Sequence, residues 1–215
     1  MANQQPSLNI EKSFLLQNED ECIYALVGCL LGDSSIESKT KYIVTSHSII
    51  NKDYTVFKYN EFIRFLKIGT LGISNNYGTN PDLELRKSYR FRINDKELSS
   101  LLEPMFYNKY RNRLLPDLSF FNEISLFFWY MDDGCLIIRN NGSYIRRSLK
   151  IALKSLCDQD ILNLVKFLKT KYNLNFRVEY NTEKTKIIKI LMHSEKDIAE
   201  FFNLLYKFYK FIPTS

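Results

Sequence analysis

The sequence predicts an α+β fold made of two copies of one αββαββα unit, related by a pseudo-twofold axis. Two short apolar stretches that each end in an acid, 25–33 and 125–134, recur half a chain apart and place Asp33 and Asp133 100 residues apart. A base, two apolar residues and a proline occur at 113–116 and again at 210–213. Repetition over this distance indicates duplication of a whole structural unit. We expect a polar N-terminal arm over 1–18, a first repeat over 19–116 and a second repeat over 117–215.

The hydrophobic patterns predict the same order of elements in both halves. In the first half we expect helices over 19–32, 54–68 and 95–110, and strands over 34–37, 41–46, 71–75 and 85–93. In the second half we expect helices over 120–131, 158–172 and 195–209, and strands over 135–138, 144–153, 176–180 and 186–192. Turn formers fill 75–81, and Asn140-Asn141-Gly142 is a strong hairpin signal. Asp158 and Ser194 are the expected N-cap residues of the last two helices.

Composition indicates a folded protein with an anionic partner. The 215 residues are 45% hydrophobic, enough to bury a core, and the net charge is +6. Such a charge fits nucleic acid or a merely soluble basic protein. The four cysteines have no CxxC spacing and His47 and His193 are the only histidines, which excludes a structural zinc site and leaves a metal bound by oxygen. Cys22 and Cys29 are expected to pack as small apolar residues.

Segment composition favours an intracellular protein that does not bind membranes. No apolar run has the length of a membrane span, and the cysteines show no disulfide pattern. Residues 1–17 lack arginine and do not resemble a secretory or import peptide. Richness in Asn, Ile, Lys, Tyr and Phe suggests an AT-rich genome, so we expect a mitochondrial protein or one of another organelle.

Alternation along the strands concentrates positive charge on one face. Along 86–93 it separates Arg86, Ser88, Arg90 and Arg92 from Tyr89, Phe91 and Ile93, and along 145–153 it separates Arg146, Ser148 and Lys150 from Ile145, Leu149, Ile151 and Leu153. Further bases on these strands and their turns are Lys39, Lys41, Arg139, Arg177, Lys184 and Lys186. Antiparallel sheets often show a charged face to water. Few acids balance these bases, however, which favours a face that binds nucleic acid.

The paired helices that end in Gly32-Asp33 and in Asp132-Asp133-Gly134 resemble the LAGLIDADG family of homing endonucleases, in the single-chain form with two motifs. The yeast mitochondrial intron endonucleases of this class are similar, and the resemblance extends from about residue 19 to residue 213. It implies paired motif helices at the axis and two saddle-shaped antiparallel sheets with helices on their outer face. It also implies a monomer that recognises a long, asymmetric double-stranded DNA target through the major groove and cuts both strands.

The resemblance assigns catalysis to Asp33 and Asp133, which would hold Mg²⁺, with Mn²⁺ as a substitute. Two facing carboxylates repel each other, and a divalent ion with oxygen ligands makes their proximity favourable. Such an ion neutralises charge at the scissile phosphate and activates water. Gly32 and Asp132, next to the two acids, complete the candidate metal set. Asp132 lies about 100° around the helix from Asp133, which favours a capping role.

Two further expectations concern bases and helix packing. Arg113 and Lys210 match basic residues near the active site of single-chain relatives and would polarise water or stabilise the transition state; phosphate contact or surface exposure is an equal alternative. Gly28 and Gly32 are expected to form a flat groove on the first motif helix. The bulk of Phe128 and Trp129 on the second helix would fill that groove.

Other functions remain open. Residues 130–133, Tyr-Met-Asp-Asp, match the acidic signature of reverse transcriptases, but a polymerase needs a further upstream acid and a larger architecture. A maturase that binds its own intron RNA, or a DNA-binding protein without activity, could share the fold. Retention of both Asp33 and Asp133 favours cleavage, because a pure RNA binder has no chemical need for them.

Overall fold

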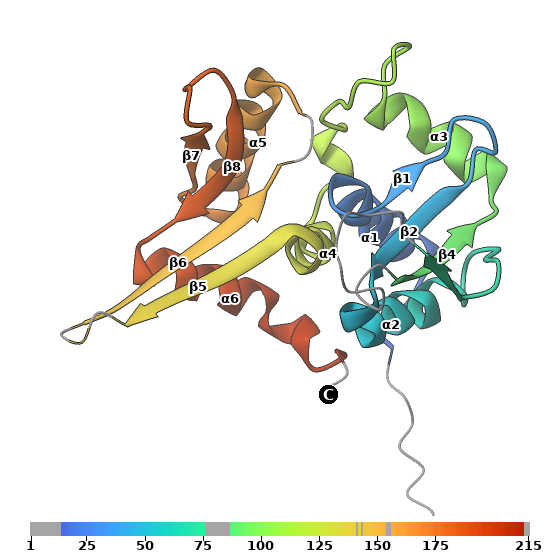
Figure 1. Cartoon of the computed structure of the whole chain (residues 1–215), viewed down its shortest axis with the longest axis horizontal. Helices are drawn as coiled ribbons and strands as arrows, with labels where there is room; N and C mark the ends of the chain where they lie inside the picture. The colour runs from blue at the N-terminus through green and yellow to red at the C-terminus, as the bar shows by residue number, and fades with distance from the viewer. Residues whose placement is uncertain (1–13, 76–86, 141, 143, 154–155, 213–215) are drawn as a thin grey trace, which may run out of the picture.

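The computed structural model describes residues 14–75, 87–140, 142, 144–153 and 156–212. Within these residues the chain forms two four-stranded antiparallel sheets and six α-helices, which confirms the α+β prediction. Helices α1 (Glu19–Leu31) and α4 (Glu123–Asp133) lie in the middle, with one sheet on each side (Figure 1). None of the helices in the described part of the chain has the length and apolarity needed to cross a membrane.

Both sheets have the same topology. The first half contributes β1 (Ser35–Ile36), β2 (Ile43–Ser48), α2 (Lys52–Phe62), β3 (Gly72–Asn75), β4 (Lys87–Ile93) and α3 (Lys96–Phe106), with strand order β1-β2-β4-β3. The second half contributes β5 (Gly134–Asn140), β6 (Ile145–Ala152), α5 (Asp158–Tyr172), β7 (Arg177–Tyr180), β8 (Ile187–Met192) and α6 (Glu195–Tyr209), in the order β5-β6-β8-β7. The predicted order of elements is therefore confirmed in each half.

Helix ends follow local hydrogen bonds. Ser194 caps α6 as expected, but Cys157 is the N-cap of α5, and the Asp158 carboxylate accepts a bond from the backbone of Ile187 instead. Helix α2 is shorter than predicted because residues 67–69 hydrogen-bond with the end of β4: Gly69 N–H donates to Arg92 O, and Asn94 N–H donates to Lys67 O. Backbone groups that pair with a strand cannot continue a helix.

The α1–α4 crossing is held by small residues on both helices, which corrects the expected small-against-large packing. A Cβ atom on Gly28 would lie 2.2 Å from the backbone oxygen of Ser125, so the two backbones are in direct contact there. The Ser125 hydroxyl donates a hydrogen bond across the crossing to Tyr24 O at 2.7 Å. Phe128 instead stacks on Phe57, and Trp129 packs edge-on against Phe121.

The apolar core lies beneath both sheets and around the central helix pair. Cys22 and Cys29 on α1 are fully buried, and burial raises the pKa of the Cys29 thiol to about 12. They pack as apolar residues, as expected. Helix α2 lies against β2 and β4, whereas α5 contacts β8 and α6 contacts β6. Helices thus cover one face of each sheet and leave the other face for a partner.

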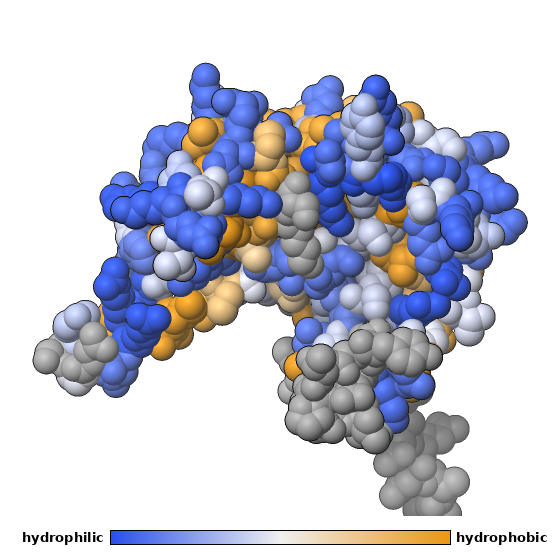
Figure 2. Space-filling model, turned by 45° about the horizontal axis from the view of Figure 1, so that its top comes forward, coloured by the Kyte–Doolittle hydropathy of each residue, from blue (hydrophilic) through white to orange (hydrophobic). Residues whose placement is uncertain are grey.

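The hairpin of β5 and β6 extends beyond its covering helix. Arg147 bonds to Glu195 in the first turn of α6, so strand residues farther out have no helix against them. Ile138 is 58% exposed and Ile145 is 50% exposed. Ile145 lies opposite the basic face, as its alternation along β6 predicts, but it is exposed and outside the core. The left side of Figure 2 shows this hairpin standing clear of the body.

The last residues of the predicted polar arm are anchored in the fold. Leu15 and Leu16 are buried, and their backbone N–H groups donate to the Glu61 carboxylate at 3.0 and 2.9 Å. Arg64 donates to Leu16 O at 2.6 Å. Leu15 and Leu16 therefore belong to the core of the first half, where Glu61 on α2 and Arg64 just beyond it bind their backbone.

Candidate active site and nucleic-acid interface

The two motif helices end side by side, and each end carries one predicted catalytic acid. Asp33 follows Gly32, the C-cap of α1, and Asp133 is the last residue of α4. The backbone N–H of Asp33 donates to Asp132 Oδ2 at 3.1 Å, which ties the end of α1 to the end of α4. The side chain of Asp33 is 30% exposed and is accessible to a ligand from solvent.

Asp132 is a buried structural acid. Lys58 Nζ donates to both of its oxygens, at 2.8 and 3.0 Å, and the Tyr54 hydroxyl donates to Oδ1 at 2.9 Å. Its side chain is fully buried, as is that of Lys58. With the Asp33 N–H also bound, both carboxylate oxygens are occupied. These contacts favour the capping role of Asp132 over a role as a metal ligand.

Charge on this cluster is fixed by its partners. Burial is the largest influence and would lower the pKa of the Lys58 ammonium, but the Asp132 carboxylate and Cys29 together outweigh it and the pKa is raised. Burial and the Asp132 charge raise the pKa of the Tyr54 phenol. Lys58 is therefore a cation and Tyr54 a neutral donor, and together they compensate the buried charge of Asp132.

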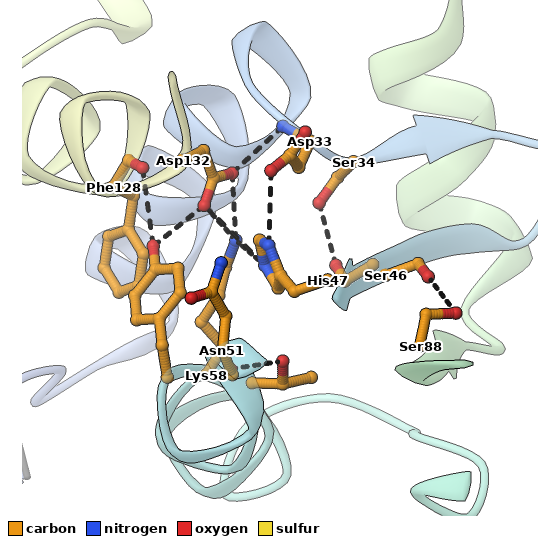
Figure 3. Close-up of polar contacts among 12 residues, drawn as sticks. Asp33, Ser34, Ser46, His47, Asn51, Lys58, Ser88, Phe128 and Asp132 are labelled. Atoms are coloured by element: carbon orange, nitrogen blue, oxygen red, sulfur yellow. Dashed lines mark hydrogen bonds and ion pairs between the residues drawn. The ribbon is translucent and has the colours of Figure 1, made fainter. Parts of the chain in front are cut away.

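His47 joins this cluster to Asp33 (Figure 3). Its Nδ1 lies 3.2 Å from Asp33 Oδ2, and its Nε2 lies 3.3 Å from Lys58 Nζ. An ammonium only donates hydrogen bonds, so Nε2 accepts and Nδ1 carries the proton. In this tautomer the Nδ1–H faces the Asp33 carboxylate.

Asp33, His47 and Asp132 come close enough for one atom of each to reach a single ion, since these atoms lie within 4.8 Å of one another. The Lys58 ammonium, however, lies 2.8 Å from Asp132 and already supplies the positive charge at that point. A second cation there would be repelled. The remaining acids at the helix ends are Asp33 and Asp133, whose carboxylates are the hard oxygen donors that Mg²⁺ prefers.

The two predicted catalytic bases occupy different environments. Arg113 donates to Leu30 O and, at 3.0 Å, to Ser34 O, so it caps the end of α1 and braces the turn that carries Asp33. Lys210 follows α6 directly. Because Lys207 pairs with Glu123 at 2.5 Å, this end of α6 lies at the start of α4, about 15 Å along that helix from its acidic end. The structure does not bring Lys210 to the acids.

The glycine of the candidate metal set, Gly32, also has a packing role. A Cβ atom at this position would lie 2.5 Å from Asp132 Cβ, and its N–H bonds to Gly28 O at 3.1 Å. Only glycine lets the end of α4 approach the end of α1 this closely.

The outer face of the second sheet carries several bases besides the paired Lys189 and Glu179. Strand register places Arg139 opposite Arg146, and Cys135 opposite Lys150, on the face turned away from the core. Arg177 on β7 lies on the same face through its pairing with Leu191. Burial, Arg146 and Arg177 together lower the pKa of His193. Like charges directly opposite each other destabilise a sheet, so this pattern fits a face that meets an anion.

The first sheet is less uniformly basic than predicted. Arg90 and Arg92 share the outer face of β4, but Arg92 pairs with Glu37 at 3.3 Å. Lys41 Nζ forms an ion pair with Glu103 Oε1 at 2.7 Å. Of the other predicted DNA-binding residues, Lys39, Lys184 and Lys186 are exposed, and Arg86 lies outside the described residues.

Sequence reasoning missed three site residues: His47, Tyr54 and Lys58. A signal was present for two of them. His47 alternates with Ile43 and Thr45 on the buried face of β2, and Lys58 shares a helical face with Phe62. A basic or titratable residue at a core position indicates a buried partner. The partner itself, Asp132, comes from the other half of the chain and only the tertiary fold reveals it.

Two motif helices packed between two four-stranded sheets define the architecture of a LAGLIDADG endonuclease. The chain belongs to the LAGLIDADG DNA endonuclease family, whose model matches residues 23–198. A probable intron-encoded endonuclease 1 of Wickerhamomyces canadensis is 26% identical over 188 residues, which cover 84% of this chain and 76% of that protein.

Solved structures share this fold. The homing endonuclease I-WcaI bound to its DNA recognition sequence has a TM-score of 0.69 and 22% identity, covering 94% of this chain and 89% of that one. I-GzeII in complex with its DNA target has a TM-score of 0.52 and 11% identity, covering 88% and 87%. At these identities the likeness establishes the fold alone.

Proposed function

We propose that the protein is a site-specific endonuclease that cuts both strands of a long, asymmetric DNA target with a divalent metal ion. One observation carries the proposal: the two acid-bearing helix ends are joined by the bond from Asp33 N–H to Asp132, so Asp33 and Asp133 end at one place. Family membership and the DNA-bound state of I-WcaI support it. Both half-sites lie on one chain, so a monomer suffices.

The proposed DNA interface comprises the outer faces of both sheets. Figure 2 shows the molecule hollowed between its two halves, where a duplex would lie. The bases of β4, β5 and β6 would contact phosphates and base edges there, and the exposed Arg139 and Arg146 on the extended hairpin would reach farthest along the duplex.

In the proposed reaction Asp33 and Asp133 hold the metal, Mg²⁺ or Mn²⁺, against the scissile phosphates. When bound, a divalent ion neutralises the charge that develops on the phosphate and lowers the pKa of a bound water. The chain itself fixes the acids: Asp132 holds the Asp33 backbone, and Arg113 braces the turn that carries Asp33. Arg113 therefore acts on the position of Asp33 in this proposal, and we assign no role in the reaction to Lys210.

The test is cleavage by single variants. The purified protein is incubated with a plasmid library of candidate insertion sites, with and without Mg²⁺, and the cut site is then cloned. Asp33→Asn and Asp133→Asn should each abolish double-strand cleavage and keep binding to that site. Full cleavage by either variant contradicts the assignment. Tight binding to the intron RNA and faster splicing, without DNA cleavage in Mg²⁺ or Mn²⁺, would replace it with a maturase.

The W. canadensis relative is named as a probable intron-encoded endonuclease, and we propose that an intron also encodes this protein. An intron-encoded origin would place the protein in the compartment of its intron, which we propose to be the mitochondrion or another organelle. The same proposal takes 19–116 and 117–215 as the two repeats.

A further inference from the structure

The buried polar cluster beside the acids takes most of its side chains from one repeat. His47 and Lys58, which are buried, come from the first half, and the fully buried side chain of Asp132 comes from the second. Helix α5, the counterpart of α2, buries only Ile161, Leu164 and Leu168. Helix α5 therefore supplies no buried equivalent of Lys58.

Strand register identifies the counterpart of His47. Ser35 pairs with Val44 in the first sheet, and Cys135, 100 residues later, pairs with Lys150 in the second. Val44 and Lys150 are thus equivalent, and three residues farther along each chain stand His47 and Leu153. Leu153 packs against the core. A leucine cannot donate a hydrogen bond to an acid.

We propose that His47 is a positioning residue for Asp33 alone, so that the two strand cuts depend on different residues of the chain. This inference rests on the proposed endonuclease function. His47 Nδ1 lies 3.2 Å from Asp33 Oδ2, and Lys58, held by Asp132, fixes the ring by bonding to Nε2 at 3.3 Å. The Asp33 carboxylate is oriented by a buried chain of partners, whereas Leu153, the equivalent of His47 in the second repeat, is apolar.

Removal of His47 should therefore slow one strand cut selectively. Hydrogen-bond partners of metal-binding groups typically contribute about 10- to 100-fold to activity. The diagnostic substitution is His47→Leu, which gives the first repeat the side chain that the second repeat has at this position. His47→Gln is the rescue variant, because its amide can still donate to Asp33.

The experiment uses a supercoiled plasmid that carries the site cut by the wild-type protein, with Mg²⁺ and with each strand labelled separately. His47→Leu should accumulate nicked circles that are always cut in the same strand, with the other strand cut about 10- to 100-fold more slowly than by wild type. His47→Gln should restore most of the lost rate. Leu153→Ala, the matched control, should lower the melting temperature and leave the ratio of the two strand rates at its wild-type value.

Equal slowing of both strands, or unchanged rates, overturns the role of His47. Asp33→Asn separates this result from failure of the underlying function: if Asp33→Asn loses cleavage but His47→Leu keeps the wild-type strand ratio, only the positioning role is wrong. If Asp33→Asn still cuts, the active-site assignment itself is wrong and the positioning role is wrong with it. Should His47→Leu not fold, His47→Asn takes its place, since a shorter amide no longer reaches Asp33 and should give the same single-strand defect.

Discussion

Substitution of Gly28 by alanine should destabilise the protein at the crossing of α1 and α4. The added Cβ would lie 2.2 Å from the Ser125 oxygen, and contacts under 3.0 Å are essentially never seen. The helices must therefore separate by roughly 0.8 Å, because a backbone atom in a close-packed core cannot turn away as a side chain can. Overpacking of this kind costs about 1–3 kcal/mol, against which alanine gains about 0.5–1 kcal/mol in a helix interior.

The net loss is about 0–2.5 kcal/mol, and its midpoint of roughly 1.25 kcal/mol should lower the melting temperature of a chain of this size by about 2.5–5 °C. Cleavage should fall more steeply than stability, because the two acids are placed by the same crossing and a misplacement of about 1 Å can cost about 100-fold in rate. Thermal unfolding and plasmid cleavage measure the two effects. Gly72→Ala is the control, since a Cβ at Gly72 meets nothing within 4 Å. A melting temperature of Gly28→Ala equal to that of Gly72→Ala would refute the close backbone contact.

Two further predictions concern charge. Lys58→Met leaves Asp132 buried without its cation and should lower the free energy of unfolding by about 3–5 kcal/mol in urea titrations; a loss below about 1 kcal/mol would mean that the pair behaves as an exposed one. Arg139→Ala should weaken DNA binding, and the slope of log affinity against log salt concentration should fall by about 0.9 for each lost phosphate contact. Stability should stay equal or rise, because Arg146 loses the like charge opposite it. Lys41→Ala should keep wild-type affinity for DNA, because the Lys41 ammonium already pairs with Glu103. Equal losses of affinity in Lys41→Ala and Arg139→Ala would contradict the different roles of the two sheets.

The repeated apolar motif that ends in an acid correctly predicted two similar halves with a central pair of helices. A helix that packs against a partner and ends in a carboxylate needs a run of apolar residues followed by an acid, which is visible in the sequence. Alternation along β4 and β6 likewise identified the outer faces that carry Arg90 and Arg146. The second repeated mark, the base followed by two apolar residues and a proline, does not fall at matching places in the two halves. Arg113 lies seven residues beyond α3 and Lys210 directly follows α6, so equal sequence patterns stand at unequal places in the fold.

The sequence by itself determined the elements, their duplication and the two acids that end the motif helices, since helix and strand periodicity are set by neighbours along the chain. Tertiary structure decided what each acid does. Asp132 and Asp133 are adjacent in sequence, yet Asp132 is buried against Lys58 from the other half of the chain. His47 lies beside Asp33 because β2 pairs with β1 inside the first half. Contacts between residues far apart in the chain depend on how the two halves pack, and local sequence holds no record of that geometry.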